Sequence, residues 1–345
     1  MTDLTHTPSP DHSNTVVLAH GGGGQLTDQL VAQSVLPRLT NDVLADLLDA
    51  AVVDAGPGRL ALTIDGYVVQ PLEFPGGDIG RLAISGTVND LAVSGAAPAA
   101  IALGLILEEG LDRAVLDRVM DSIGRAADEA GVRVVTGDTK VVGRGQADGM
   151  YITTAGVGFV SGEPPHPGRV RAGDVLILNG PIADHGLAVM LAREMPEVRS
   201  VLRSDVAPLN RLIAKVLERT DGVRFMRDPT RSGVAGVVAD LAERTGLRIV
   251  LEQEAVPLRP ETNHAAEMLG LDPLEVANEG KVIIVADPAA AAEILAVLRD
   301  DPLGAGAAVV GRVEAADAPL AELHTAIGGR RIIQKPYGEQ LPRIC

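Results

Sequence analysis

The last residue of this 345-residue sequence, Cys345, is its only cysteine. It ends a segment, residues 335–345, in which two prolines and a glycine are incompatible with a stable helix. We therefore predict an extended, mobile tail that bends at Gly338 and could carry the thiol roughly 24 Å into a neighbouring cleft. A terminal thiol can equally be a solvated side chain without function, because it gains reactivity only from the place where it docks. The tail by itself does not decide between these interpretations.

Four aspartates lie at the ends of predicted elements or in apolar surroundings, where a buried carboxylate needs a partner. They are Asp65, Asp90, Asp138 and Asp228. Taken singly, each could be a helix cap, a turn residue or a surface charge. A glycine-rich stretch near the N-terminus could converge its backbone N–H groups on an anion. It consists of His20, Gly21, Gly22, Gly23 and Gly24. It is not a P-loop, and alone it could be a flexible loop. Together the two features predict Mg²⁺ held by carboxylates and by the phosphate oxygens of a nucleotide.

Two further charged residues lie next to predicted strands. Lys140 ends the motif that starts at Thr136, which we predict to be a tight loop after a strand, the usual position for chemistry in an α/β fold. Glu279 precedes another predicted strand. The alternative is structural: Glu279 could form an ion pair with Lys140 or with the nearby Lys281.

The composition describes a globular chain with a core of small aliphatic residues. Hydrophobic residues make up 46%, aromatic residues 2%, and the mean hydropathy is +0.19. The net charge of −16 argues against nucleic acid or an anionic membrane as a partner, and a nucleotide would need a metal ion to bind. One cysteine excludes an internal disulfide and fits the cytoplasm. No apolar run approaches the ~20 residues of a membrane span, so we expect a cytoplasmic protein without a membrane segment.

Hydrophobic periodicity predicts two successive halves in which strands and helices alternate. Residues 161–168 are rich in proline and glycine and predict the boundary between the halves. We expect an α/β (α+β) protein with a disordered leader (1–14), an N-terminal domain (15–162), a C-terminal α/β domain (169–334) and the tail (335–345). The predicted helices are 27–36, 79–93, 111–130, 234–243 and 288–299, with a further apolar helix after 184–186. The predicted strands are 59–69, 100–107, 132–135, 151–160, 174–178, 282–285 and 308–313.

Six segments carry a resemblance that covers nearly the whole sequence. They are Phe74–Gly80, Gly86–Ala92, Thr136–Val142, Asp228–Arg231, Ala277–Lys281 and Pro342–Cys345. They resemble the hydrogenase-maturation carbamoyl dehydratases, the HypE family. That family is similar in fold to aminoimidazole ribonucleotide synthetase (PurM), selenophosphate synthetase and thiamine-phosphate kinase. The aspartate pattern is shared across this superfamily, whereas the ending Pro-Arg-Ile-Cys is specific. The sequence departs from the expected pattern at Ala183 and Ser232, where glycine is expected.

The resemblance implies a two-domain PurM-like fold and a homodimer formed through the first domain. It implies that the carbamoyltransferase HypF loads a carboxamide onto the Cys345 sulfur. ATP then phosphorylates the amide oxygen, which makes that oxygen a good leaving group, and loss of phosphate leaves an S-cyanide. The cyanide would pass to an iron-carrying HypC–HypD complex and end as a ligand of the nickel–iron hydrogenase centre.

The resemblance also implies roles for individual residues. Cys345 carries the reacting group, Glu279 is the carboxylate base for the amide protons, and Lys140 offers a compact cation to the phosphoryl oxygens. Magnesium would be held by Asp65, Asp90, Asp138 and Asp228. The residues expected to bind ATP are His20, Gly21, Gly22, Gly23, Gly24, Asp65, Asn89, Asp90, Thr136, Asp138, Asp228 and Thr230.

Two alternatives stay open. One is a selenophosphate synthetase or a thiamine-phosphate kinase of the same fold, although the former is expected to carry its reactive cysteine or selenocysteine near the N-terminus. The other is a non-enzymatic scaffold that carries a cargo on Cys345. A scaffold needs no magnesium carboxylates, so Asp90, Asp138, Lys140 and Glu279 argue against it.

Overall fold

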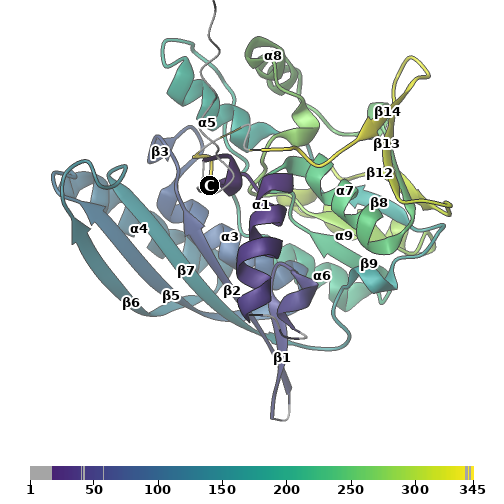
Figure 1. Ribbon diagram of the computed structural model, residues 1–345, viewed down its shortest axis with the longest axis horizontal. Coiled ribbons are helices and arrows are strands. Elements are labelled where there is room, and N and C mark those ends of the chain that lie inside the picture. The colour runs from purple at the N-terminus through teal and green to yellow at the C-terminus, as the bar shows by residue number, and fades with distance from the viewer. Residues whose placement is uncertain (1–17, 40, 42, 57, 339–340, 342) are drawn as a thin grey trace, which may run out of the picture.

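A computed structural model of the chain describes residues 18–39, 41, 43–56, 58–338, 341 and 343–345. The leader predicted for residues 1–14 lies outside the described residues. Figure 1 shows two sheets side by side, each with its own helices, and the C-terminus lies between them, to the left of α1 in this view. Within the described part of the chain, no helix is long and apolar enough to cross a membrane.

The first sheet is formed by residues 51–160 and has the strand order β1-β2-β7-β5-β6. Only β5 and β6 run parallel in it, so the sheet is mixed. Helices α3 and α4 cover one face, where Ala61, Ile101 and Ile152 are fully buried. Along β2 the alternate residues Leu62 and Ile64 are exposed on the other face. The elements are β1 (Ala51–Ala55), β2 (Gly58–Tyr67), β3 (Glu73–Phe74), β4 (Gly77–Asp78), α3 (Ile79–Val93), β5 (Ala96–Glu108), α4 (Arg113–Ala130), β6 (Arg133–Val142) and β7 (Met150–Val160).

Helix α3 has the bounds predicted for it, and its first turn explains why. The Asp78 carboxylate accepts hydrogen bonds from the backbone N–H groups of Gly80 and Arg81. Nearly every residue that follows is buried between the first sheet and α4 or α6. A helix buried on all sides shows little amphipathic pattern, so the cap is what marks its start in the sequence.

The second sheet is formed by residues 175–333, with the strand order β14-β13-β10-β12-β8-β11-β9. Alternate residues of β11 face two separate apolar cores: Ile283 and Val285 face one, Ile284 and Ala286 the other. Both faces of the sheet are therefore covered, which explains the continuous apolar run in this strand. The elements are β8 (Val175–Leu178), α5 (Asp184–Glu194), α6 (Asn210–Arg219), β9 (Val223–Arg227), α7 (Gly233–Thr245), β10 (Arg248–Glu252), α8 (Pro260–Leu269), β11 (Ile283–Ala286), α9 (Ala291–Arg299), β12 (Ala308–Glu314), β13 (Leu320–His324) and β14 (Arg330–Ile333).

Several predictions about local structure need correction. The motif from Thr136 to Lys140 lies inside strand β6 and not on a loop, because residues 136–142 continue the parallel ladder with β5. Helix α9 begins at Ala291, after a turn in which Asp287 accepts from the Ala289 N–H. Elements that were not predicted are β1, β3, β4, α6, β9, β10, α8, β13 and β14.

The N-terminal segment lies against the C-terminal half of the chain. Predicted as one helix, it consists of α1 (Gln25–Leu30), a π-helical turn (Val31–Val35) and α2 (Leu36–Leu39). The backbone N–H groups of Gln25 and Leu26 donate to the carbonyl oxygens of Pro336 and Tyr337. The start of α1 thus binds the start of the tail.

Candidate active site

The end of the tail is seated between the two sheets. Ile344 is 2% exposed and belongs to the same apolar cluster as α3, Val206 and Ala277. One residue earlier, the Arg343 carbonyl accepts a 3.2 Å hydrogen bond from the Gln70 N–H. Cys345 is half-buried and lines a cavity of about 40 Å³. The other residues lining that cavity are Asp65, Gly66, Tyr67, Gly86, Asp90, Asp228, Thr230, Arg231 and Glu279.

Three of the four predicted aspartates meet at this cavity, and each comes from a different element. Asp65 lies on β2, Asp90 on α3, and Asp228 directly after β9. Burial raises the pKa of Asp90 and Asp65, and for Asp90 the negative charges of Asp228 and Asp65 raise it further. Burial and the charge of Asp49 raise the pKa of Asp228 to about 8. Asp228 is therefore mostly protonated near neutral pH.

A second cavity, of about 210 Å³, adjoins the first and shares these three aspartates. Its wall includes Gly23, Thr230 and Arg231. On its floor Arg227 lies 3.0 Å from Asp49 and 2.9 Å from Asp240. The same acidic cluster thus faces a small cavity with the thiol on one side and a larger one with the glycine stretch on the other.

Glu279 lies beside the thiol and is 2% exposed. Among the described residues, its Oε1 atom has no hydrogen-bond partner. Burial and the charges of Asp228 and Asp205 raise the pKa of Glu279 well above its usual value. Burial and the Glu279 charge likewise raise the pKa of the Cys345 thiol. The raised pKa makes the ionised form of either group a stronger base than usual.

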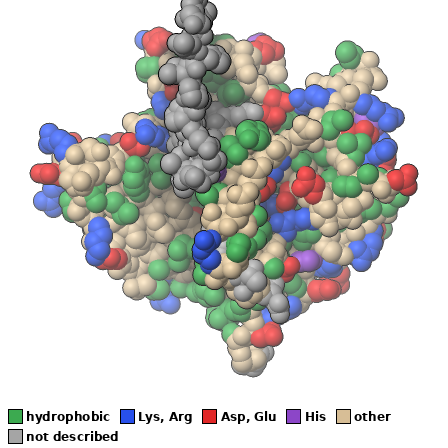
Figure 2. Space-filling view, viewed as in Figure 1, with side chains coloured by type: hydrophobic (Ala, Val, Ile, Leu, Met, Phe, Trp, Pro, Cys, Tyr) green, Lys and Arg blue, Asp and Glu red, His purple; other side chains and the backbone are tan. Residues whose placement is uncertain are grey.

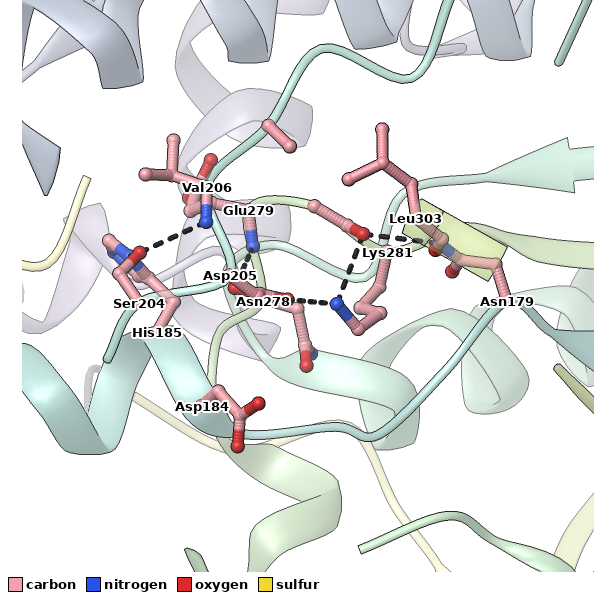
Figure 3. Close-up of polar contacts among 12 residues, drawn as sticks. Asn179, Asp184, His185, Ser204, Asp205, Val206, Asn278, Glu279, Lys281 and Leu303 are labelled. Carbon is pink, nitrogen blue, oxygen red and sulfur yellow. Dashed lines mark hydrogen bonds and ion pairs between the residues drawn. The ribbon is translucent and has the colours of Figure 1, made fainter. Parts of the chain in front are cut away.

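The backbone behind Glu279 is fixed by a buried ion pair (Figure 3). Lys281 Nζ lies 2.9 Å from Asp205 Oδ2, and Asp205 Oδ1 accepts from the Glu279 N–H at 3.1 Å. The suggested pairing of Glu279 with Lys281 is therefore not the one observed, because Lys281 binds Asp205. Asn89 supports the same segment, since its amide donates to the Glu279 carbonyl and accepts from the Leu209 N–H.

Three predicted residues lie away from this cluster, on strand β6 at the edge of the first sheet. They are Thr136, Asp138 and Lys140, and all three are exposed. Lys140 lies 2.9 Å from Asp138, and this neighbour holds the pKa of Asp138 below its usual value. The structure therefore divides the predicted site between a buried cluster and an exposed strand.

The glycine stretch contacts the residues at the start of α7, next to the acidic cluster. Arg231 donates a 3.0 Å hydrogen bond to the Gly21 carbonyl, and Ser232 Oγ lies 3.3 Å from the Gly22 carbonyl oxygen. Gly23 has a φ of +69° and lines the larger cavity. His20 is joined to α1 through its carbonyl, which accepts from Thr27 Oγ1.

Both departures from the expected glycines occur where the backbone is left-handed. Ala183 has a φ of +72° and Ser232 a φ of +67°, a region that glycine enters without strain. Ser232 stands at the start of α7, yet its hydroxyl does not cap the helix and contacts Gly22 instead.

Two residues that sequence reasoning did not single out belong to the site. Arg231 lines both cavities, and Asp49 lies beside Arg227 in the larger one. Arg231 is part of the motif that begins at Asp228, so this motif could have indicated that Arg231 belongs to the site. Asp49 precedes a short strand whose weak pattern gave no signal.

The donor set suits a magnesium ion that is bound in part by phosphate. Burial and the neighbouring carboxylates raise the pKa of Asp90 and Asp228. A divalent cation bound between such carboxyl groups would stabilise their ionised form. Within the described residues, no three His, Cys, Asp or Glu side chains converge well enough to hold a metal alone. Mg²⁺ usually takes one or two carboxylates together with substrate phosphates, which matches this arrangement.

Comparison with known proteins covers both halves of the chain. The family model for the AIR synthase related protein, N-terminal domain, matches residues 48–160, and that for its C-terminal domain matches residues 171–321. Carbamoyl dehydratase HypE of Rhodobacter capsulatus is 48% identical over 334 residues, which is 96% of this chain and 98% of that protein.

Two solved structures are similar over most of their length. A HypE–HypF complex contains a chain with a TM-score of 0.84 and 37% identity, covering 89% of this chain and 99% of that one. The hydrogenase maturation protein HypE in complex with ATP has a TM-score of 0.80 and 41% identity, covering 96% and 100%. The expected two-domain PurM-like fold is confirmed.

Proposed function

This chain belongs to the carbamoyl dehydratase HypE family of hydrogenase maturation, and from that premise we propose how its residues perform the dehydration. The reaction is the ATP-dependent conversion of an S-carboxamide on Cys345 to an S-cyanide. One observation carries the assignment of residues: Cys345 and Glu279 line one small cavity together with Asp65, Asp90 and Asp228.

The dehydration takes place in two steps. The carboxamide oxygen attacks the γ-phosphorus of ATP, the bond to the β-phosphate oxygen breaks, and the amide nitrogen loses its first proton. The carbon–oxygen bond then breaks, phosphate leaves, and loss of the second proton gives the nitrile. The sulfur–carbon bond to Cys345 is kept throughout, so the products are S-cyanide, ADP and phosphate.

Glu279 is the base in this scheme. The amide nitrogen becomes acidic only as the oxygen is phosphorylated, so the base must lie beside the sulfur-bound carbon. Glu279 shares the cavity with Cys345 and offers a buried oxygen without a partner among the described residues. The negative field of its neighbours makes its ionised form strongly basic.

Asp65, Asp90 and Asp228 would hold magnesium, and the larger cavity under the glycine stretch would hold ATP. Bound magnesium would neutralise charge on the phosphates. Gly21 to Gly24, Thr230 and Arg231 would contact the nucleotide from the α7 side. Asn89 would act through the backbone of Glu279, because its side chain is already bonded to backbone groups.

A homodimer across β6 would bring Asp138 and Lys140 into the reaction. β6 is an edge strand, and its residues Val135 and Val141 are exposed, as are Asp138 and Lys140. Large apolar side chains are also exposed on the open face of the same sheet, and Figure 2 shows hydrophobic side chains on this half of the molecule. We propose that pairing covers this surface and offers Lys140 to the phosphoryl oxygens in the other copy.

The partners follow from the same chemistry. A carbamoyltransferase of the HypF kind would load the carboxamide, and an iron-carrying HypC–HypD complex would accept the cyanide. Both need access to Cys345, so the tail must leave the seat observed here. We propose that these exchanges take place in the cytoplasm.

Intact-mass analysis of the carbamoylated protein with and without Mg-ATP tests the proposal. We expect loss of one water from the C-terminal peptide only with ATP. Glu279→Gln should accept the carboxamide and bind ATP but stop before the S-cyanide, at a normal melting temperature. Cys345→Ala should fold and bind ATP without forming product. Product formed by either variant would refute these assignments.

A further inference from the structure

His185 is a fully buried side chain in the first turn of α5 that the mechanism above does not use. Its ring lies against the edge of Phe74, with 5.4 Å between ring centroids and an interplanar angle of 84°. Its Nε2 atom lies 2.9 Å from the carbonyl oxygen of Ile344. That carbonyl belongs to the last peptide bond of the chain, directly before Cys345.

The hydrogen bonds around the ring fix which nitrogen carries the proton. A carbonyl oxygen can only accept, so Nε2 of His185 must donate to Ile344. Burial lowers the pKa of His185, which keeps the ring neutral and leaves Nδ1 as an acceptor. Ser204 Oγ lies 2.8 Å from Nδ1 and must therefore donate to it. The same hydroxyl accepts from the Val206 N–H at 3.1 Å (Figure 3).

We propose that His185 is the positioning residue that holds the last peptide of the tail, so that the Cys345 sulfur faces Glu279. Ser204 sets the ring for this task by holding its tautomer. The consequence for catalysis rests on the proposed function, but seating of the tail can be measured without ATP or a partner.

The other tail contacts do not replace this one. The Arg343 carbonyl is held by the Gln70 N–H, and the Arg343 guanidinium lies 3.2 Å from Asp148. These contacts end before the Ile344 peptide, whose rotation decides whether the sulfur faces the carboxyl cluster. The Ile344 side chain packs in the core, but apolar packing is not directional. The hydrogen bond from His185 fixes the orientation of the peptide between Ile344 and Cys345.

Alkylation of Cys345 by iodoacetamide measures seating directly, because this is the only cysteine in the sequence. The seated thiol lines a cavity of about 40 Å³ and should react slowly. His185→Phe keeps a ring against Phe74 but leaves the buried Ile344 carbonyl without a donor, so alkylation should be roughly tenfold faster. Ser204→Ala should give a smaller increase, and His185→Gln, which retains an N–H donor, should restore part of the protection. His264→Phe, at an exposed position on α8, is the control and should match the wild type.

Each outcome bears on the proposal. If His185→Phe and Ser204→Ala both react at the wild-type rate while folded, His185 does not hold the tail and the inference fails. If His185→Phe unfolds, Ser204→Ala and His185→Gln decide the question by the same measurement.

In the dehydration assay, His185→Phe should bind Mg-ATP and accept the carboxamide normally, but form S-cyanide roughly tenfold more slowly. The two assays can also disagree. If the variants change the alkylation rate as expected but the wild type forms no S-cyanide, the proposed function is refuted and the role of His185 in seating the tail still holds.

Discussion

The backbone N–H of Gln25 donates a 2.9 Å hydrogen bond to the carbonyl oxygen of Pro336, which ties the first helix to the start of the tail. A second bond joins Leu26 to Tyr337, and Lys335 lies 2.6 Å from Asp28. The last residue held in this way directly precedes Gly338, the predicted bend. The glycine stretch lies just before Gln25, so the segment that faces the proposed nucleotide cavity also holds the tail next to its predicted bend.

Replacing Gly24 by alanine should break this connection. A Cβ atom at Gly24 would lie 2.2 Å from the Pro336 oxygen, although the backbone φ of −91° suits any residue. Gly24→Ala should therefore expose Cys345 to faster alkylation and slow dehydration while the protein stays folded. Gly124→Ala, in α4 where a Cβ meets nothing within 4 Å, is the matched control. Equal alkylation rates in the two variants would show that α1 does not hold the tail.

The sequence singled out more of the residues that line the small cavity than of the elements that surround it. Asp65, Asp90, Asp228, Glu279 and Cys345 were singled out from their surroundings or motif, and the structure brings all five to one cavity. These five residues lie far apart in the sequence. Only the family resemblance could therefore indicate, before the structure was known, that the carboxylates and the tail share one site. The location of the seat depends on tertiary packing that no local pattern encodes.

Strand β6 shows why local signals failed elsewhere. The motif from Thr136 to Lys140 contains glycine and aspartate, which disfavour strands, yet it continues the ladder because β5 offers a partner along its whole length. Strands β13 and β14 were missed because each is short and lies at or near an edge of the second sheet.

Ser232→Gly should stabilise the protein. A residue with a side chain at a φ of +67° costs roughly 1 kcal/mol that glycine avoids, and the hydrogen bond from Ser232 Oγ to the Gly22 carbonyl is long at 3.3 Å. Ala183→Gly relieves the same strain but removes a fully buried methyl group, worth about 0.8 kcal/mol, so it should be nearly neutral. Thermal unfolding of both variants tests the pair. A lower melting temperature for Ser232→Gly would mean that its hydroxyl group stabilises the protein by more than the strain costs.

Binding of Mg-ATP should strengthen as pH rises to about 8. Burial and Asp49 raise the pKa of Asp228 to about 8, so below that pH the carboxyl is protonated and must lose its proton to face a cation. Affinity should rise about tenfold per pH unit for each proton released, and level off above the pKa. The free energy of unfolding changes with pH in the opposite direction. The stability that protonated Asp228 contributes is fully present below pH 3.8 and is lost as pH rises through about 8.

Calorimetry of Mg-ATP binding in two buffers with different ionisation enthalpies counts the protons released. Asp228→Asn should bind more weakly and release fewer protons than the wild type. An affinity that does not change from about pH 6 to about pH 8 would exclude a protonated carboxyl cluster as the metal site.

Mixing two inactive variants tests whether Lys140 acts on the other copy in a dimer. Lys140→Met lacks the exposed cation on β6, and Glu279→Gln lacks the buried base. If the two residues act in different copies, a mixed dimer has one site that contains both wild-type side chains and one site that lacks both. About one site in four should then recover after random subunit exchange. If Lys140 serves its own chain, every site lacks one residue and the mixture stays inactive. Exchange is verified independently by native mass spectrometry with one variant isotopically labelled, so an inactive mixture with proven mixed dimers would exclude the role proposed for Lys140 in the partner's site.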